Sequence, residues 1–414
     1  MDRRTTNQEI AATLGRTAAA GALYTTPVVT VLLSSMSFGF ALSTFYLLPK
    51  YLLVRLQASA FEIGVITSVF GLATVAATPL LAVWIGVISR RRLIVAGSLA
   101  MSLSSAAFIL IKELGIALIL LRALQGFGFA VVFTAVTALV SELAPVRRMS
   151  EALGLAGASM LIMNAVAPPL MEGLARSAGW NAVFATASVS ALFAAGLALL
   201  IEEEQTTREA NAGPGVLREF VGRARTKHYA YIIAALGAAF GAMFTFAQPF
   251  AMELGRQEVG GFFFAYASTA IALRLFFGGL PDRLGRYPTA VLAINLYTLA
   301  VMASSAMKPD LLEMAGVALG IAHGVFFPAF NGMMMASVPS WERGRVMAVF
   351  TASFYGGLSA GVLIFGVVAE LLGYAAVFLA AGATTFAAGG LLVLSPEFRN
   401  EAYRPLPSEQ GAEW

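Results

Sequence analysis

Apolar residues along this chain fall into runs of about 20, separated by short polar connections. A helical run of that length crosses the hydrocarbon core of a bilayer, which is about 30 Å thick. The pattern therefore predicts membrane-spanning helices. We expect twelve spans, at about residues 27–48, 61–86, 93–111, 115–140, 152–173, 181–201, 229–253, 259–280, 289–307, 311–338, 346–369 and 374–396.

One connection differs from the others in length and composition. Residues 202–228 are strongly charged and are interrupted by Gly213-Pro214-Gly215, so we interpret them as a linker between two sets of six spans. The N-terminal segment lacks the short apolar core and small-residue cleavage site of a signal peptide, and we expect it to be a tail. The predicted organisation is a cytoplasmic tail (1–26), a six-helix bundle (27–201), a cytoplasmic linker (202–228), a second six-helix bundle (229–396) and a cytoplasmic C-terminal tail (397–414).

The composition agrees with a membrane protein. Hydrophobic residues make up 58% of the chain and charged residues 12%, against about 25% charged in soluble domains, so a polar surface cannot form. The absence of cysteine excludes disulfides, thiolate metal sites and cysteine nucleophiles. The methionines at 333–335 point to different faces of a helix and do not suggest a metal site. We expect no cofactor, no metal and no nucleic-acid partner.

Basic residues predict the orientation. Of the 27 lysines and arginines, 19 fall on the side of the N-terminus, 6 on the other side and 2 inside predicted spans. Cytoplasmic loops of membrane proteins carry such an excess of lysine and arginine. We therefore expect a multi-pass protein of the cytoplasmic (inner) membrane with both termini in the cytoplasm. The net charge of +4 reflects this topology and does not indicate a nucleic-acid partner.

The two halves of the chain repeat one another. A shift of 196 residues aligns loop arginines and span glycines, and a shift of 194 aligns "GWNAVF" (179–184) with "GYAAVF" (373–378). Internal repetition in this register indicates duplicated units with the same orientation, since six spans return the chain to its starting side. The pairs aligned by 196 are Gly64 with Gly260, Arg90 with Arg286, Gly128 with Gly324, and Arg147 with Arg343.

Local motifs add a resemblance to a known family. "GGLPDRLGR" (278–286) and "RALQG" (122–126) are similar to motifs of the major facilitator superfamily. The resemblance implies an all-α membrane protein in which two six-helix bundles are related by a pseudo-twofold axis along the membrane normal. Two departures are visible: Gly86 replaces the acid of the loop motif in the first half, and the proline-glycine motif of drug antiporters is reduced to "NAVAPPLMEG" (164–173).

The charged loop at 278–286 predicts a gate. Asp282 is expected to accept hydrogen bonds from backbone amides at a helix N-terminus, where the helix dipole favours an anion. Arg283 and Arg286 are expected to pair with Glu342 at the same membrane face. Anchoring of the topology is the alternative role for the two arginines.

A second group of residues predicts a central binding site. Ionisable groups inside a span are costly and usually functional. The resemblance implies that the first, fourth, seventh and tenth spans line a cavity, and helical spacing places the candidates of the fourth span on one face and those of the tenth on another. The candidates are Arg122 and Gln125 in the fourth span, Gln248 in the seventh, and His323, Phe327 and Asn331 in the tenth. The alternatives are that Arg122 braces neighbouring helices and that His323 is a neutral packing residue.

The charge of this candidate site favours one class of solute. No Asp or Glu lies near the centre of a predicted span, whereas Arg122 does lie inside one. Such a cavity disfavours cations and favours anionic or zwitterionic solutes. Protons are a candidate coupling ion, through His323, whose unperturbed pKa of about 6.5 lies near physiological pH, or through a carboxylate of the solute.

The function predicted from these features is secondary active transport of a small organic solute by alternating access. The chain has no phosphate-binding glycine loop for ATP and no cluster of acid and histidine residues for an enzyme. We expect a monomeric permease, for uptake or efflux, whose partners are the solute and the lipid bilayer. The alternatives are a drug or metabolite efflux antiporter of the same fold, a membrane-embedded transferase and a non-transporting membrane sensor.

Overall fold

The computed structural model describes residues 24–145, 148–201, 222–277, 279, 283–336, 338 and 343–398, and in these ranges the chain is helical, without strands. Eleven helical segments are long and apolar enough to cross a membrane. The helices of the first half are α2 (Thr26–Thr44), η1 (Phe45–Leu47), α3 (Leu48–Leu56), α4 (Ala60–Val87), α5 (Arg90–Ala107), η2 (Phe108–Leu110), α6 (Ile116–Leu143) and α7 (Met149–Leu199). Those of the second half are α9 (Ala224–Glu253), α10 (Gly260–Phe277), α12 (Arg286–Ala303), η4 (Ser304–Ala306), η5 (Pro309–Leu311), α13 (Leu312–Ala336), α14 (Arg343–Leu372) and α15 (Tyr374–Leu394).

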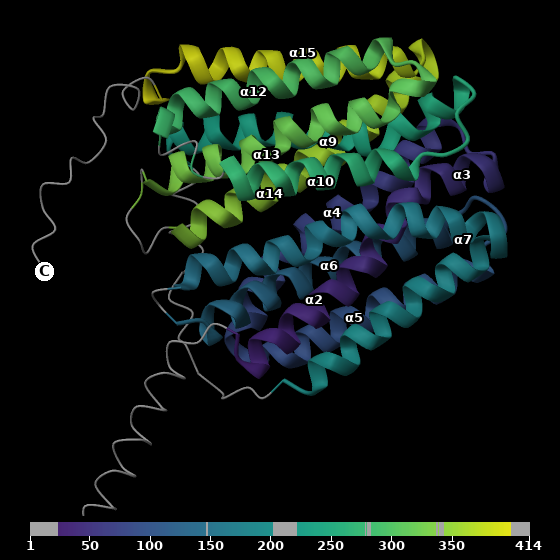
Figure 1. Ribbon diagram of the computed structural model, residues 1–414, viewed down its shortest axis with the longest axis horizontal. Coiled ribbons are helices and arrows are strands. Elements are labelled where there is room, and N and C mark those ends of the chain that lie inside the picture. The colour runs from purple at the N-terminus through teal and green to yellow at the C-terminus, as the bar shows by residue number, and fades with distance from the viewer. Residues whose placement is uncertain are drawn as a thin grey trace, which may run out of the picture.

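The apolar runs predicted these helices well except at two places. The first span continues through η1 and α3 to Leu56, where Pro49 stands in the first turn of α3, a position in which its missing N–H costs no hydrogen bond. The fifth and sixth predicted spans form one 51-residue helix, α7, which is interrupted at Gly179. Figure 1 shows α7 turning back on itself at its labelled end.

Gly179 and Gly373 confirm that the predicted repeat is structural. The two residues begin the aligned "GWNAVF" and "GYAAVF" stretches, and their φ angles are 82° and 81°. Residues with a Cβ atom rarely adopt this left-handed backbone, so both turns require glycine. The two halves therefore use the same turn at equivalent positions.

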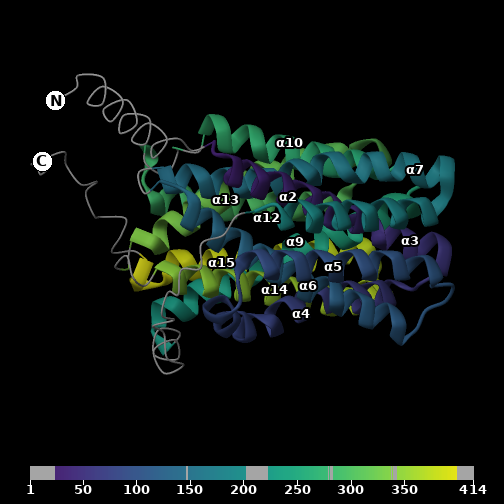
Figure 2. The ribbon, with the colours of Figure 1, turned by 90° about the horizontal axis from the view of Figure 1, so that it is seen from below.

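Helix packing also repeats between the halves. In the first half α4 packs on α6, and α5 packs on both α6 and α7. The equivalent helices of the second half make the same pairs, α10 with α13, and α12 with both α13 and α15. Figures 1 and 2 show the helices running side by side along the long axis, and Figure 1 shows those up to α7 grouped on one side and those from α9 onward on the other.

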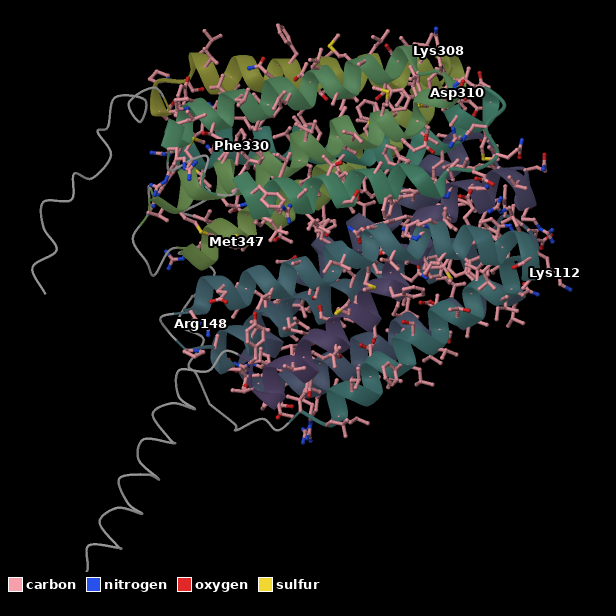
Figure 3. The ribbon with its side chains drawn as sticks, viewed as in Figure 1. Lys112, Arg148, Lys308, Asp310, Phe330 and Met347 are labelled. Carbon is pink, nitrogen blue, oxygen red and sulfur yellow. The ribbon has the colours of Figure 1, made fainter. Side chains whose placement is uncertain are left out.

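The two ends of the bundle can be identified by labelled residues. Figure 3 shows Lys112, Lys308 and Asp310 at one end, which we call the Lys112 end, and Arg148 and Met347 at the opposite end, the Arg148 end. Between the ends, large apolar side chains such as Leu103, Val189 and Phe386 are 65–70% exposed. A soluble monomer rarely exposes apolar surface on this scale, so these faces are suited to lipid.

Candidate functional site

Arg122 is a buried cation of the first half. It lies on α6 with 6% of its surface exposed, and its Nη1 donates to Oε1 of Gln125 at 2.7 Å. Its guanidinium also sits over the ring of Phe70, 4.9 Å from the ring centre. Phe70 can reach this position because α4 approaches α6 closely at Gly126, where a side chain would collide with the Phe70 carbonyl. The glycine beside Gln125 thus sets the place of the cation.

Several polar atoms of this cluster lack a partner. Arg122 forms no ion pair with a carboxylate in the part of the chain that the structure describes. Its Nε and the Nε2 of Gln125 are buried without a hydrogen-bond partner. Buried polar groups are normally satisfied, and an unsatisfied pair of donors is a place where a ligand can bind. These two donors would suit the oxygen atoms of an anion.

Gln248 connects the halves near this cluster. It is fully buried on α9, and its Nε2 donates to the carbonyl oxygens of Tyr46 (2.7 Å) and Phe244 (2.9 Å). The Oε1 atom of Gln248 has no partner among the described residues. Tyr46 belongs to η1 of the first half, so this hydrogen bond joins the two halves.

The sequence did not suggest Tyr46 or Asn164 as site residues. Asn164 accepts a hydrogen bond from the Ser43 hydroxyl at 2.7 Å and also lies within interaction range of the Tyr46 hydroxyl. An amide inside the predicted span 152–173 was a signal that could have identified Asn164. Tyr46 had no such signal, because tyrosine is common near the ends of membrane helices.

His323 lies on α13 inside a cage of aromatic rings. The centres of Phe240, Phe326 and Tyr266 are 5.1, 5.6 and 5.8 Å from the centre of the imidazole ring. Its Nδ1 is 3.4 Å from the hydroxyl of Tyr297 on α12. A hydrogen-bond partner on a neighbouring helix agrees with the alternative that His323 is a neutral packing residue. The residue as a whole is half-buried.

Phe327 and Asn331 extend from His323 toward the Arg148 end, as the spacing predicted. The guanidinium of Arg274 on α10 lies over the Phe327 ring at 5.2 Å. Asn331 donates through Nδ2 to the Phe327 carbonyl at 3.1 Å, and its Oδ1 is 3.5 Å from the Tyr229 hydroxyl. Neither residue contacts the Arg122 cluster within the described ranges.

Aromatic rings join the two groups of candidates. One row runs from Tyr46 to Phe244 (5.0 Å) and Phe240 (4.1 Å), and Phe240 contacts His323. Ring contacts also run from Phe70, which lies under the Arg122 guanidinium, through Phe129, Tyr355 and Phe354 to His323. The candidates therefore form two polar positions linked by aromatic rings. That all six residues line one binding site stays a prediction.

A charged cluster at the Lys112 end ties the halves together. Glu172, on α7, is 5% exposed and accepts hydrogen bonds from the amides of Val259 (2.9 Å) and Gly260 (2.6 Å) at the start of α10. Lys50 pairs with Glu172 at 2.5 Å and also donates to the Gln257 carbonyl across the halves. The sequence analysis did not select Glu172 as a site residue.

Further cross-half contacts lie toward the same end. Arg176 pairs with Glu258, and the Phe61 amide donates to Glu370 at 3.3 Å. Gly64 on α4 faces Gly366 on α14 so closely that a Cβ on Gly64 would lie 3.0 Å from the Gly366 Cα. The halves are thus held together at the Lys112 end.

The predicted gate at the Arg148 end is only partly described. Asp282 and Glu342 lie outside the described residues, so their predicted contacts stay predictions. Arg283 and Arg286 are exposed and form no ion pair with another described residue. In the first half, Arg90 pairs with Glu142 at 2.7 Å, but the repeat places Val338 where the second half would need this acid.

The family comparison agrees with this architecture. The family model described as Major Facilitator Superfamily matches residues 29–314 and 254–413. The chain belongs to the Major Facilitator Superfamily and is a multi-pass membrane protein. No group of three or more histidines, cysteines or acids that could hold a metal ion occurs among the described residues.

Curated relatives are similar over part of their length. An uncharacterised MFS-type transporter of Pseudomonas aeruginosa is 29% identical over 175 residues, which is 41% of this chain and 42% of the relative. The multi-drug resistance efflux pump PmrA of Streptococcus pneumoniae is 28% identical over 167 residues, 39% of this chain and 40% of the pump. The chain thus spans about two fifths of the length of these relatives.

Solved structures share the fold at low identity. A crystal structure of a mutant of the nucleoside transporter NupG has a TM-score of 0.75 and 14% identity, covering 89% of this chain and 99% of that one. A POT family transporter in complex with 5-aminolevulinic acid has a TM-score of 0.75 and 11% identity, covering 90% and 96%. These likenesses show the fold.

Proposed function

We propose that the protein is a secondary active transporter that moves a small anionic or zwitterionic organic solute across the cytoplasmic membrane. The observation that carries this proposal is the buried Arg122, which has no carboxylate partner among the described residues and whose Nε, like Gln125 Nε2, is unsatisfied. A buried cation is costly without a counter-ion. A solute carboxylate would supply the missing negative charge and accept hydrogen bonds from Arg122 Nε and Gln125 Nε2.

The proposed architecture is twelve spans in two six-helix bundles related by a pseudo-twofold axis, with α7 counted as two spans divided at Gly179. The bundles are 27–201 and 229–396, joined by the linker 202–228, with tails at 1–26 and 397–414. The repeated helix pairs and the matching turns at Gly179 and Gly373 support this division. Its action as a monomer without enzymatic activity belongs to the same proposal.

The described contacts support an inward-facing state. If the excess of basic residues marks the cytoplasmic side, the Lys112 end faces outward and is closed by the Glu172 cluster. Alternating access would require this cluster to separate while the Arg148 end closes. Arg286 is suited to that second closure, because its half lacks the acid that engages Arg90.

Replacement of Asp282 by asparagine is expected to lower transport and leave membrane insertion unchanged, because a neutral amide loses the charge that a helix N-terminus stabilises. Uptake into proteoliposomes and the amount of protein in the membrane fraction measure the two effects. Wild-type transport by the variant would contradict a latch at Asp282. Arg283→Gln and Glu342→Gln would then identify whether their pair closes this end alone.

The solute class can be tested directly on the purified protein. We expect organic acids and amino acids at millimolar concentration to raise its thermal unfolding temperature, whereas sugars and hydrophobic cations do not. The POT family neighbour was solved in complex with 5-aminolevulinic acid, which carries an amine and a carboxyl group. This ligand supports including such molecules in the screen. Counterflow in proteoliposomes should then follow the same ranking, and an outward proton gradient would reveal coupling through His323 or the solute.

A drug or metabolite efflux antiporter is the second candidate. The aromatic row beside His323 and the similarity to PmrA favour it, because flat apolar walls accept large hydrophobic solutes. Stabilisation by hydrophobic cations alone would support this candidate and overturn the argument from Arg122.

A further inference from the structure

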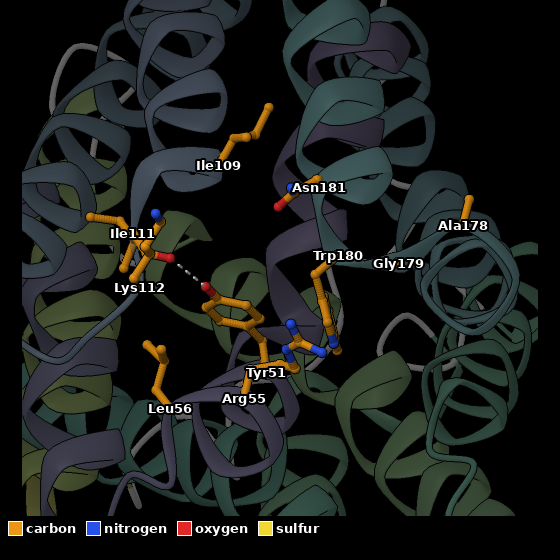
Figure 4. Close-up of a pocket in the computed structure, with 10 residues that line it drawn as sticks. All are labelled: Tyr51, Arg55, Leu56, Ile109, Ile111, Lys112, Ala178, Gly179, Trp180 and Asn181. Carbon is orange, nitrogen blue, oxygen red and sulfur yellow. Dashed lines mark hydrogen bonds between the residues drawn. The ribbon is translucent and has the colours of Figure 1, made fainter.

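A hollow of about 450 Å³ lies in the first half at the Lys112 end, away from the central candidates. It is bounded by the end of α3, by the connection between η2 and α6, and by the turn of α7 around Gly179 (Figure 4). The residues that line it are Tyr51, Arg55, Leu56, Ile109, Ile111, Lys112, Ala178, Gly179, Trp180 and Asn181.

Two cations line this hollow without a balancing acid. Within the described part of the chain no carboxylate pairs with Arg55 or Lys112. Glu113 follows Lys112 in sequence but is not part of the lining. Two unpaired positive charges that share one hollow attract an anion, and their placement on the side that has few basic residues is otherwise unexplained.

Three other basic residues near this end do have acidic partners. Lys50, Arg176 and Arg256 are each paired with a glutamate, the last with Glu313. Arg55 and Lys112 have no such partner among the described residues, and they share one hollow. Lys308 on the second half has none there either but lies outside the hollow, so it provides a matched control.

The walls of the hollow are held in place by packing. The Tyr51 hydroxyl donates to the Ile111 carbonyl at 3.4 Å, and the Tyr51 ring meets Trp180 edge-on at 5.1 Å. Figure 4 shows the Arg55 guanidinium beside Trp180, with Asn181 and Lys112 on opposite sides of the opening. The polar groups can therefore surround one ligand.

The rest of the lining is apolar. Leu56, Ile109 and Ile111 form this part, and tryptophan and tyrosine are typical of the level where lipid tails meet headgroups. A ligand that suits both parts has an anionic head and an apolar tail. We propose that the hollow binds an anionic phospholipid through its phosphate, which Arg55 and Lys112 neutralise and Asn181 contacts.

Native mass spectrometry of the full-length protein with added phosphatidylglycerol tests this site. We expect the double variant Arg55→Gln/Lys112→Gln to bind this lipid at least 10-fold more weakly than the wild type. Lys308→Gln, which removes a cation of the same end outside the hollow, should bind as the wild type does. Phosphatidylcholine should bind the wild type and the double variant equally. Its choline cation balances the charge of its phosphate, so the headgroup has no net charge for Arg55 and Lys112 to attract.

Each alternative outcome is informative. Equal retention of phosphatidylglycerol by the wild type and the double variant would overturn the site. Protection of the wild type from thermal unfolding by inorganic phosphate alone, at the same concentration as the lipid, would overturn the lipid as its occupant. Asn181→Glu is a second variant with both cations intact, and it should also weaken lipid binding because it introduces a carboxylate into the hollow. The result does not depend on which solute is transported.

Discussion

Replacement of Arg122 by glutamine is expected to lower the affinity for an anionic solute about 10- to 100-fold and to lower transport accordingly. A hydrogen bond to a charged group contributes about 1.5–3 kcal/mol, and about 1.4 kcal/mol corresponds to a factor of ten in affinity. Arg122 offers an unsatisfied Nε beside Gln125 Nε2, so the solute would lose charge neutralisation and one donor. Thermal-shift titration and proteoliposome uptake measure the two effects.

The same variant distinguishes binding from bracing. If Arg122 only held α6 against its neighbours, its replacement would destabilise the protein, because a bound partner would be left unsatisfied. If it awaits a solute, the unliganded variant should be at least as stable as the wild type, since an uncompensated buried charge has been removed. A lower unfolding temperature without ligand, together with unchanged solute affinity, would refute the binding role. Arg148→Gln, an exposed change at the other end, serves as the control.

The second large effect is expected for Glu172→Gln. In this variant the Lys50 pair is lost, and a neutral amide replaces the carboxylate that accepts from Val259 and Gly260. Breaking a buried pair costs about 3 kcal/mol or more, which corresponds to a shift of roughly 100-fold in an equilibrium between two states. Since the cluster joins the halves only when the Lys112 end is closed, the variant should populate a state in which this end is open.

Spin labels can report this opening without background, because the chain has no cysteine. Ser177→Cys on α7 and Lys308→Cys on the second half place one label on each side of the closed end. We expect Glu172→Gln to add a longer label-to-label distance to the distribution measured by pulsed electron paramagnetic resonance. Glu313→Gln breaks the pair with Arg256 inside the second half and should leave the distances unchanged. Identical distributions for Glu172→Gln and the unmodified sequence would contradict a latch at Glu172.

The helices and the repeat could be predicted because both are visible in the order of residues along the chain. Runs of about 20 apolar residues and glycines at fixed offsets need no knowledge of distant contacts, and the backbone angles of Gly179 and Gly373 confirm the alignment. Helix α7 was predicted as two spans, 152–173 and 181–201, because two apolar runs are separated by a short stretch of sequence. The turn at Gly179 lies in that stretch.

The site was harder to predict because its contacts are remote in sequence. Arg122 and Gln125 are three residues apart, and their hydrogen bond follows from helical spacing. Glu172 and Gly260 are 88 residues apart, and the carboxylate gains its role only from the fold. His323 was predicted as an ionisable group, but its aromatic cage comes from α9, α10, α13 and α14. Charge in a span indicates where to look, and tertiary structure decides the neighbours.

The facing glycines at 64 and 366 have a consequence for the speed of the cycle. Where α4 meets α14, the two backbones touch without intervening side chains. In the proposed alternating-access cycle, one helix could roll on the other at this point without displacing a side chain there, so we expect the ionic cluster around Glu172 to contribute more to the activation barrier than this contact does. The glycine contact and the Glu172 cluster are separate parts of the interface. Substitutions in the cluster could therefore change the turnover rate without changing the geometry of the helix contact.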